Sequence, residues 1–239
     1  SLDYIFLGTE GGGGVFRSTD NGNSWTKVDN GLTTPNIIDA LAINSEDHVF
    51  AGSYGDGVFK STNNGDNWTQ INNGLTGLYP VSFAINSLDH IFTGTFLGDG
   101  VFRSTNGGSN WTQINNGLVA TEVRTLKFNS TNYLFAGTYG TGMFRSADFG
   151  ENWNALNNGL TAAYFTSIAS NSIDQIFAGA DFVDGAGGVF RSTDNGENWT
   201  EVNQGVITTD VRAIAINSNN DIFVGTYFGG GVYRSTDNG

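Results

Sequence analysis

The side chains with the clearest chemical potential are two arginines, Arg124 and Arg212, because they alone among the arginines lie outside a position that repeats along the chain. Each follows an acidic residue, Glu122 or Asp210, by two positions. Two guanidinium groups at one site could bind a carboxylate or another anion. The alternative is a pair of local ion pairs, Arg124 with Glu122 and Arg212 with Asp210. The same repeat column begins with Asp39, so Asp39, Arg124 and Arg212 are candidate ligand-binding residues.

Aromatic side chains form a second candidate set, with nearly one member in each repeat. The set consists of Tyr54, Phe96, Tyr139, Phe182, Tyr227 and Phe228. Carboxylates occur in the same loops, at Asp56, Asp99, Asp181 and Asp184. A neutral sugar needs an apolar face to stack on and acceptors for its hydroxyls, so this combination indicates glycan binding. The alternative is that these aromatic rings fold over the ends of the sheets as packing.

A repeated eight-residue motif sets the framework that must position these residues. It reads Ser18-Thr19-Asp20-Asn21-Gly22-Asn23-Ser24-Trp25 in its first copy, and the tryptophans of successive copies are 42 to 46 residues apart. We expect a turn in which a short polar side chain bonds backbone N–H groups, glycine supplies a positive φ and tryptophan enters the next strand. The structural positions of the five full copies are Asp20, Gly22, Trp25, Asn63, Gly65, Trp68, Asn106, Gly108, Trp111, Asp148, Gly150, Trp153, Asp194, Gly196 and Trp199.

Each repeat contains four short strand signals separated by polar turns. In one repeat these are the runs at 37–43, 49–52 and 57–61 and the segment after Trp68. Four antiparallel strands per unit of about 40 to 45 residues are typical of a β-propeller blade. We therefore predict an all-β chain of four-stranded antiparallel blades that pack on one another, with Trp and Phe filling the gaps.

The repeats divide the chain at approximately 1–34, 35–78, 79–120, 121–162, 163–208 and 209–239. This gives parts of six blades, or five full periods plus an extra hairpin. We expect a single propeller or a segment of a longer propeller array. Unpaired terminal strands could also associate with another chain, because an open sheet edge offers free backbone groups.

Composition excludes several classes of partner. The net charge is −13, with ten Lys and Arg against 23 Asp and Glu, so nucleic acid and anionic membrane surfaces would be repelled. No stretch is apolar enough to cross a bilayer, so membrane insertion is not expected. The absence of Cys removes thiolate chemistry, and no loop carries the spaced acidic ladder of a calcium site. We expect no metal and no cofactor.

The eight-residue motif resembles the Asp-box, or bacterial neuraminidase repeat, most clearly in the stretch GVFRSTDNGENW at 188–199. It is also similar to repeats of photosystem assembly propellers, tandem-propeller xyloglucanases and sortilin-type receptors. The resemblance implies the propeller fold, but enzymes, receptors and assembly factors share it. Two copies carry asparagine in place of aspartate, Asn63 and Asn106. Because asparagine can make the same turn bonds, we interpret the motif as structural.

The enzymatic members of that group provide a test for catalytic residues. A sialidase needs three convergent arginines, whereas only Arg124 and Arg212 lie outside the repeated position. An inverting glycosidase needs two carboxylates roughly 6.5 to 9.5 Å apart, and nothing singles out a pair. No catalytic residue is therefore assigned.

The sequence favours a non-enzymatic binding or scaffolding propeller of an exported bacterial protein, secreted or at the cell surface. Its variable loops would bind a glycan or a protein. The alternative is the propeller domain of a glycoside hydrolase of sialidase or xyloglucanase type. In either case the turns that carry the repeated tryptophans lie at one end of the blades and the variable loops at the other.

Overall fold

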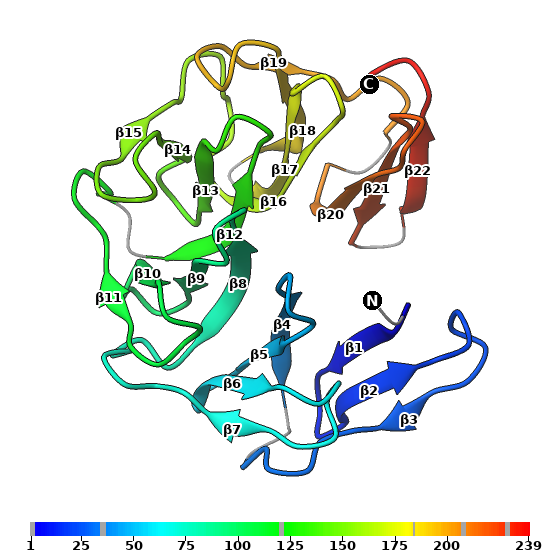
Figure 1. Cartoon of the computed structure of the whole chain (residues 1–239). Helices are drawn as coiled ribbons and strands as arrows, with labels where there is room; N and C mark the ends of the chain where they lie inside the picture. The colour runs from blue at the N-terminus through cyan, green and yellow to red at the C-terminus, as the bar shows by residue number, and fades with distance from the viewer. Residues whose placement is uncertain (1–2, 34–36, 120–121, 184, 207–208, 228–229) are drawn as a thin grey trace. The chain divides into compact units, whose positions relative to one another are not determined.

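The computed structural model describes residues 3–33, 37–119, 122–183, 185–206, 209–227 and 230–239. Phe228 and Asp184, two of the loop residues singled out above, lie outside this part of the chain. The chain divides into two compact units, Ser1–Ile114 and Asn115–Gly239. The described residues contain strands and turns but no helix (Figure 1).

Unit 1 contains three blades. Blade 1 is the three-stranded sheet β1 (Ile5–Thr9), β2 (Gly14–Ser18) and β3 (Thr26–Lys27). Blade 2 has four strands, β4 (Ile38–Ile43), β5 (Val49–Ser53), β6 (Gly57–Ser61) and β7 (Thr69–Gln70). Blade 3 also has four, β8 (Pro80–Ile85), β9 (Ile91–Thr95), β10 (Val101–Ser104) and β11 (Thr112–Gln113).

Unit 2 contains the remaining three blades. Blade 4 consists of β12 (Val123–Phe128), β13 (Leu134–Thr138), β14 (Met143–Ser146) and β15 (Asn154–Ala155). Blade 5 consists of β16 (Phe165–Ser170), β17 (Ile176–Val183), β18 (Ala186–Ser192) and β19 (Thr200–Glu201). Blade 6 has three described strands, β20 (Val211–Ile216), β21 (Ile222–Thr226) and β22 (Gly231–Ser235).

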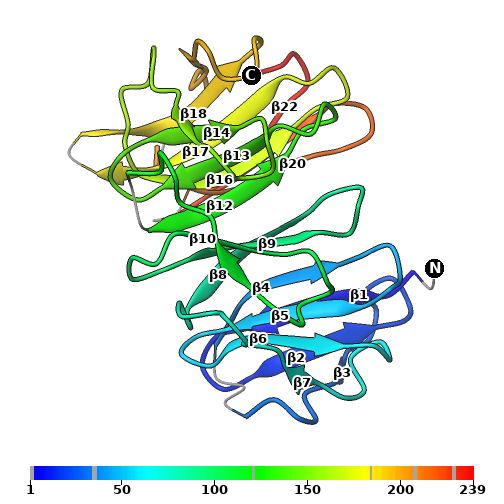
Figure 2. The same cartoon turned by 60° about the vertical axis from the view of Figure 1, so that its left-hand side comes forward.

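All neighbouring strands within a blade are antiparallel and adjacent in sequence. Within unit 2 the first strands β12, β16 and β20 contact one another in that order (Figure 2). The predicted fold class, an all-β propeller with parts of six blades, is confirmed.

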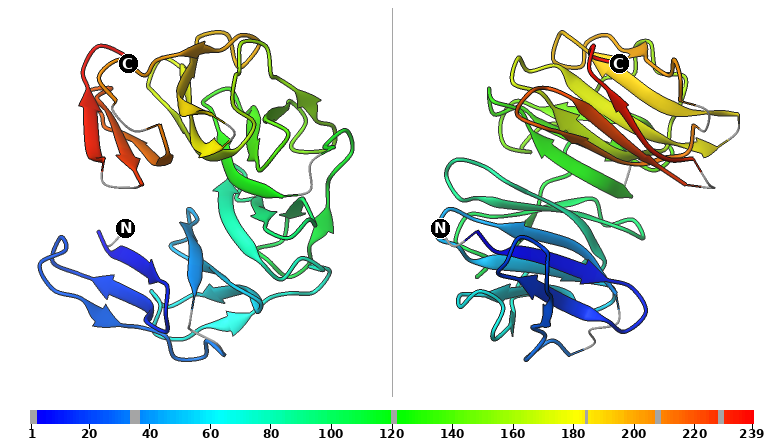
Figure 3. Two further views of the ribbon diagram at one scale, coloured as in Figure 1. Left: turned by 180° about the vertical axis from the view of Figure 1, so that it is seen from behind. Right: turned by 90° about the vertical axis from the view of Figure 1, so that its right-hand side faces the viewer.

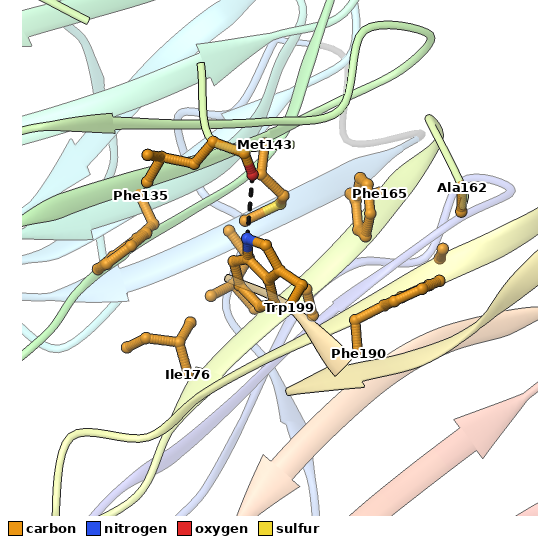
Figure 4. Close-up of a cluster of buried hydrophobic side chains, with 11 residues drawn as sticks. Phe135, Met143, Ala162, Phe165, Ile176, Phe190 and Trp199 are labelled. Atoms are coloured by element: carbon orange, nitrogen blue, oxygen red, sulfur yellow. Dashed lines mark hydrogen bonds between the residues drawn. The ribbon is translucent and has the colours of Figure 1, made fainter. Parts of the chain in front are cut away.

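The core lies between adjacent blades. Trp199 of blade 5 packs with Phe135 and Met143 of blade 4 and with Phe165 and Phe190 of its own sheet (Figure 4). Its indole Nε1 donates a 3.0 Å hydrogen bond to the carbonyl oxygen of Leu156, the residue that follows β15. Tryptophan thus provides a large apolar surface and also satisfies a backbone carbonyl on the preceding blade.

Trp68 and Trp111 repeat this arrangement in unit 1, donating to Val28 and Ile71 at 2.8 and 2.7 Å. Trp68, Trp111, Trp153 and Trp199 are each 4% exposed. Trp25 differs, because its side chain is 40% exposed. Trp25 also leads from its turn into the next strand, β3, but the described part of unit 1 places no blade against its exposed face.

The repeated turn has the expected hydrogen bonds. In blade 5, Ser192 Oγ accepts from the N–H of Gly196 at 2.8 Å, and Asp194 Oδ1 accepts from the N–H of Asn198 at 2.9 Å. Asn63 Oδ1 makes the equivalent bond to the N–H of Asn67 at 2.9 Å, which confirms that asparagine serves in this turn. The residue before the glycine also has a positive φ, 58° at Asn195, which the sequence analysis did not anticipate.

Candidate binding surface

Every blade has two chemically different ends. We call the box end the one that carries the repeated tryptophan turns, and the loop end the opposite one, formed by the connections between the second and third strands and by the links between blades. The turns between first and second strands lie at the box end, as expected, because Asn129 of one such turn donates a 3.0 Å hydrogen bond to Asn195 of a tryptophan turn.

Blades 2 to 6 each contain a β-bulge in the first strand, near the loop end. The pairing of the first two strands skips one residue there, between Ile38 and Ala40 in blade 2 and between Val211 and Ala213 in blade 6. The residues at the skipped position are Asp39, Val81, Arg124, Thr166 and Arg212. A bulge changes the direction of a side chain, so this column is placed differently from the rest of the strand.

In blade 4 the bulged Arg124 is held by its neighbours. Its Nε and Nη2 atoms each lie 2.6 Å from Glu122 Oε1. Its guanidinium carbon also lies 4.8 Å from the centre of the Tyr139 ring, within the range of a cation–π contact. Tyr139 in turn makes an edge-to-face contact with Tyr164 of blade 5 at 4.7 Å.

In blade 6 the bulged Arg212 joins two buried carboxylates. Its Nη2 donates to Asp181 Oδ1 at 3.3 Å and to Asp210 Oδ2 at 3.5 Å, and its Nε lies 2.9 Å from Asp210 Oδ1. The guanidinium carbon lies 4.9 Å from the centre of the Tyr227 ring. Asp181 and Asp210 are each only 6% exposed. The local ion pairs considered for both arginines are therefore present.

Burial raises the pKa of Asp181 above 3.8. The positive charge of Arg212 opposes that rise, whereas a hydrogen bond with Asp210 and the charge of Asp210 add to it. The protonated form of Asp181 is therefore favoured even though a guanidinium lies beside it.

The sequence-predicted aromatic residues divide between the two units. In unit 2, Tyr139, Phe182 and Tyr227 are 36%, 54% and 53% exposed. In unit 1, Tyr54 is 42% exposed and lies edge-on to Tyr79 at 4.7 Å and 6.2 Å from Phe96. The exposed Asp39 also belongs to unit 1.

The backbone hydrogen bonds show that one of the predicted aromatic residues, Phe182, does not occupy the same repeat position as the others. The backbone N–H groups of Tyr54, Phe96, Tyr139 and Tyr227 each donate to the residue two positions before the bulge of the same blade; in blade 5 the donor is Asp181. Phe182 lies one position further along and is exposed. Tyr79 and Tyr164, from the same repeat column as Glu122 and Asp210, contact the candidates Tyr54 and Tyr139 from the links between blades.

Comparison with known proteins supports the fold and the repeat. The model for the BNR/Asp-box repeat matches residues 190–201. The chain is a β-propeller built from Asp-box repeats. Among curated protein sequences, none matches it.

Several solved structures resemble this Asp-box propeller. An ancestral GH74 enzyme is 20% identical, with a TM-score of 0.73 over 98% of this chain and 36% of its own. YCF48 bound to D1 peptide is 16% identical, with a TM-score of 0.72 over 100% of this chain and 77% of its own. The extracellular domain of a hybrid two-component system from B. thetaiotaomicron is 16% identical, with a TM-score of 0.79 over 100% of this chain and 31% of its own.

The Asp-box propeller thus spans about a third of the length of the GH74 enzyme and of the sensor's extracellular domain. At these identities the likeness concerns the fold. Within the described residues, no group of three or more His, Cys, Asp or Glu side chains could hold a metal ion. No helix long and apolar enough to cross a membrane occurs there either.

Proposed function

We propose that this propeller is a non-catalytic binding protein whose loop end in unit 2 holds a glycan. The observation that carries the proposal is the pairing of exposed aromatic rings with fixed polar groups. Tyr139 and Tyr227 each lie beside an arginine that is itself held by a carboxylate. A sugar ring could stack on the exposed aromatic surface while its hydroxyls bond to the guanidinium and carboxylate groups.

The state of the carboxylates favours binding over hydrolysis. Asp181 and Asp210 share a hydrogen bond and one arginine. Both carboxyl groups lie against the same guanidinium, whereas a glycosidase pair acts from two sides of the scissile bond. Glu122 is occupied by Arg124. These groups are arranged to orient side chains rather than to transfer protons across a substrate.

A glycoside hydrolase is the second candidate, supported by the likeness to the GH74 enzyme and by the raised pKa of Asp181. A carboxyl group with a raised pKa can act as a general acid. This candidate predicts that reducing ends accumulate from a bound glycan and that Asp181→Asn abolishes their release. Binding without turnover would contradict it.

The deciding experiment is a glycan array followed by a reducing-end assay on every glycan retained. Tyr227→Ala and Tyr139→Ala are expected to weaken binding by about tenfold or more each, since a stacked ring contributes on the order of 1 kcal/mol or above. Leu88→Ala serves as the control, because Leu88 is 63% exposed in a turn at the box end. Absence of binding to any glycan would overturn the proposal and turn the search to a protein partner, as in YCF48 with its peptide.

We also propose that the protein is exported by a bacterium and is secreted or displayed at the cell surface. The support is the likeness to an extracellular domain of a bacterial sensor and the acidic composition with only three Lys. Fractionation of the native source with an antibody against the chain tests this. Recovery in the cytoplasmic fraction alone would contradict it.

A further inference from the structure

Blades 2 and 4 share one backbone arrangement at the loop end. Both have the same strand order, in blue to cyan for blade 2 and in green for blade 4, and both carry the bulge in the first strand (Figure 3). In blade 2 the N–H of Tyr54 donates to the carbonyl of Ile37 at 3.1 Å. In blade 4 the N–H of Tyr139 donates to the carbonyl of Glu122 at 3.0 Å. Tyr54 and Tyr139 are therefore equivalent residues in two copies of one framework.

The rings of these two tyrosines are also placed alike. The Tyr54 ring lies edge-on to Tyr79 of the following link, with centroids 4.7 Å apart and an interplanar angle of 73°. The Tyr139 ring makes the same contact with Tyr164, at 4.7 Å and 71°. Both rings are partly exposed. The contacts of Tyr139 are therefore a guide to what the Tyr54 ring can bind.

The bulge residue differs between the two copies. In blade 4 the guanidinium carbon of Arg124 lies 4.8 Å from the centre of the Tyr139 ring, and a guanidinium lies likewise over a tyrosine in blade 6. In blade 2 the bulge residue is Asp39, whose side chain is exposed. The face of an aromatic ring is negative, so it attracts a cation and not a carboxylate. Within the described residues of unit 1, no lysine or arginine lies over the Tyr54 ring.

The charges around the two tyrosines differ in the same sense. In blade 4 the ion pair of Arg124 with Glu122 leaves no net charge at these two positions. The corresponding residues of blade 2, Asp39 and Ile37, carry one negative charge, and Asp56 in the β5–β6 loop adds a second. Among the described residues, Asp56 forms no ion pair and its Oδ2 atom has no hydrogen-bond partner. Blade 2 thus has excess negative charge beside the ring that holds a cation in blade 4.

We propose that the loop end of blade 2 binds an arginine side chain of a peptide through its guanidinium group. The planar group stacks on the Tyr54 ring, as Arg124 stacks on Tyr139, and the Asp39 carboxylate accepts its N–H groups. An ammonium group fits less well, because it is compact and cannot stack on a ring as a flat guanidinium does. The net charge of −13 attracts a basic peptide to the chain.

This site goes beyond the proposed glycan surface, because it lies in unit 1 and uses none of the unit 2 residues. The two sites also have opposite electrostatic character. The unit 2 surface presents arginines of the chain beside its tyrosines, whereas the blade 2 site presents carboxylates and takes its cation from the ligand. Either proposal can therefore fail without the other.

The probe is the peptide acetyl-Gly-Arg-Gly-amide, and its matched control carries citrulline, an uncharged residue of nearly the same shape, in place of arginine. Titrated with the 239-residue chain and followed by ligand-observed NMR, the arginine peptide is expected to bind saturably in the millimolar range. The citrulline peptide is expected to bind about tenfold more weakly or less, because it lacks the charge that the ring and the carboxylates attract.

Variants of the chain test the residues of the site. Asp39→Arg gives blade 2 the bulge residue of blade 4 and is expected to abolish binding, because the chain then supplies its own guanidinium to Tyr54. Tyr54→Leu is expected to weaken binding about fivefold or more. Asp39→Asn is expected to weaken it as well. Asp47→Asn is the matched control, since it removes the same charge from an exposed turn at the box end of blade 2 and is expected to have no effect.

Three results would overturn the proposal. The first is no saturable binding of the arginine peptide, and the second is equal binding of the citrulline peptide. The third is an equal loss in Asp39→Asn and Asp47→Asn, which would show attraction to the overall negative charge and not to a site. The citrulline comparison stays decisive if Asp39→Arg does not fold. Binding that survives Tyr139→Ala would separate this site from the proposed glycan surface.

Discussion

The box end and the loop end of each blade use similar residue types for opposite purposes. At the box end, Ser192, Asp194 and Trp199 bond to backbone groups and reproduce the contacts of the other copies. At the loop end, Arg212 and Asp210 contact other side chains, and their counterparts differ from blade to blade. The backbone-bonded side chains stabilise the turn that every copy shares, whereas the side-chain pairs of the loop end differ between blades with the same strand pairing.

The largest test of this contrast is removal of a tryptophan. Trp199→Ala is expected to lower the free energy of unfolding by about 3 to 5 kcal/mol, because it leaves a cavity between two blades and an unsatisfied carbonyl at Leu156. Trp25→Ala, which removes a 40% exposed side chain, is expected to cost less than about 1 kcal/mol. Urea unfolding of both variants measures the difference. Equal losses of unfolding free energy would show that burial of the tryptophan between two blades is not what stabilises the box end.

A pair of glycines tests the close approach of one blade to the next. Gly159 and Gly205 have nearly the same φ, +87° and +85°, but only at Gly159 would a Cβ lie 2.1 Å from a backbone oxygen, that of Trp199. Gly205→Ala is expected to cost about 1 kcal/mol for the positive φ alone. Gly159→Ala carries that cost and roughly 1 to 3 kcal/mol of overpacking as well. Thermal unfolding of the two variants compares them, and similar midpoints would contradict the interpretation.

Within one turn, Ser192→Ala is expected to destabilise by about 1 to 3 kcal/mol, since the buried N–H of Gly196 loses its acceptor. At the loop end, Tyr227→Ala is expected to change the free energy of unfolding by less than about 1 kcal/mol, because its ring is 53% exposed. Chemical denaturation checks both. A larger loss at Tyr227 would make it part of the fold and weaken its assignment to ligand binding.

The smallest expected effect concerns pH. The amide of Asn198 is the main cause that holds the pKa of Asp194 below 3.8; burial opposes it, and the Asn198 N–H and the Ser192 hydroxyl add to the lowering. The resulting stability is present above pH 3.8 and is lost as the pH falls through the lower folded pKa. Asp181, with its raised pKa, acts in the opposite direction and loses stability as the pH rises through 3.8 towards its folded pKa.

Asp194→Asn is therefore expected to keep the turn and to reduce the loss of stability between pH 6 and pH 3. Asn63→Asp, the reverse change in blade 2, is expected to increase that loss. Urea midpoints at the two pH values provide the measurement. If neither variant alters the difference, the aspartate charge has no role in the turn.

The sequence by itself determined the repeat, the four strands of blades 2 to 5 and the hydrogen bonds of the Asp-box turn. The hydrogen bonds of the turn join residues two to four positions apart, so a serine, an aspartate or asparagine and a glycine at fixed spacing are sufficient to specify them. The glycan and anion hypotheses likewise rested on columns of the repeat that the structure keeps together, such as Arg124 beside Tyr139.

Only the tertiary structure decided which copies of a repeated residue are buried and which are exposed. Trp25 and Trp199 occupy the same repeat position, yet one is exposed and the other buried, because burial depends on the blade that lies against each. The bulge at Arg212 and the proximity of Asp181 to Asp210 also arise between strands and between blades. The strand pairs around the bulge join residues 12 to 15 positions apart, and Arg212 lies 31 positions from Asp181, so no local pattern in the sequence specifies these contacts.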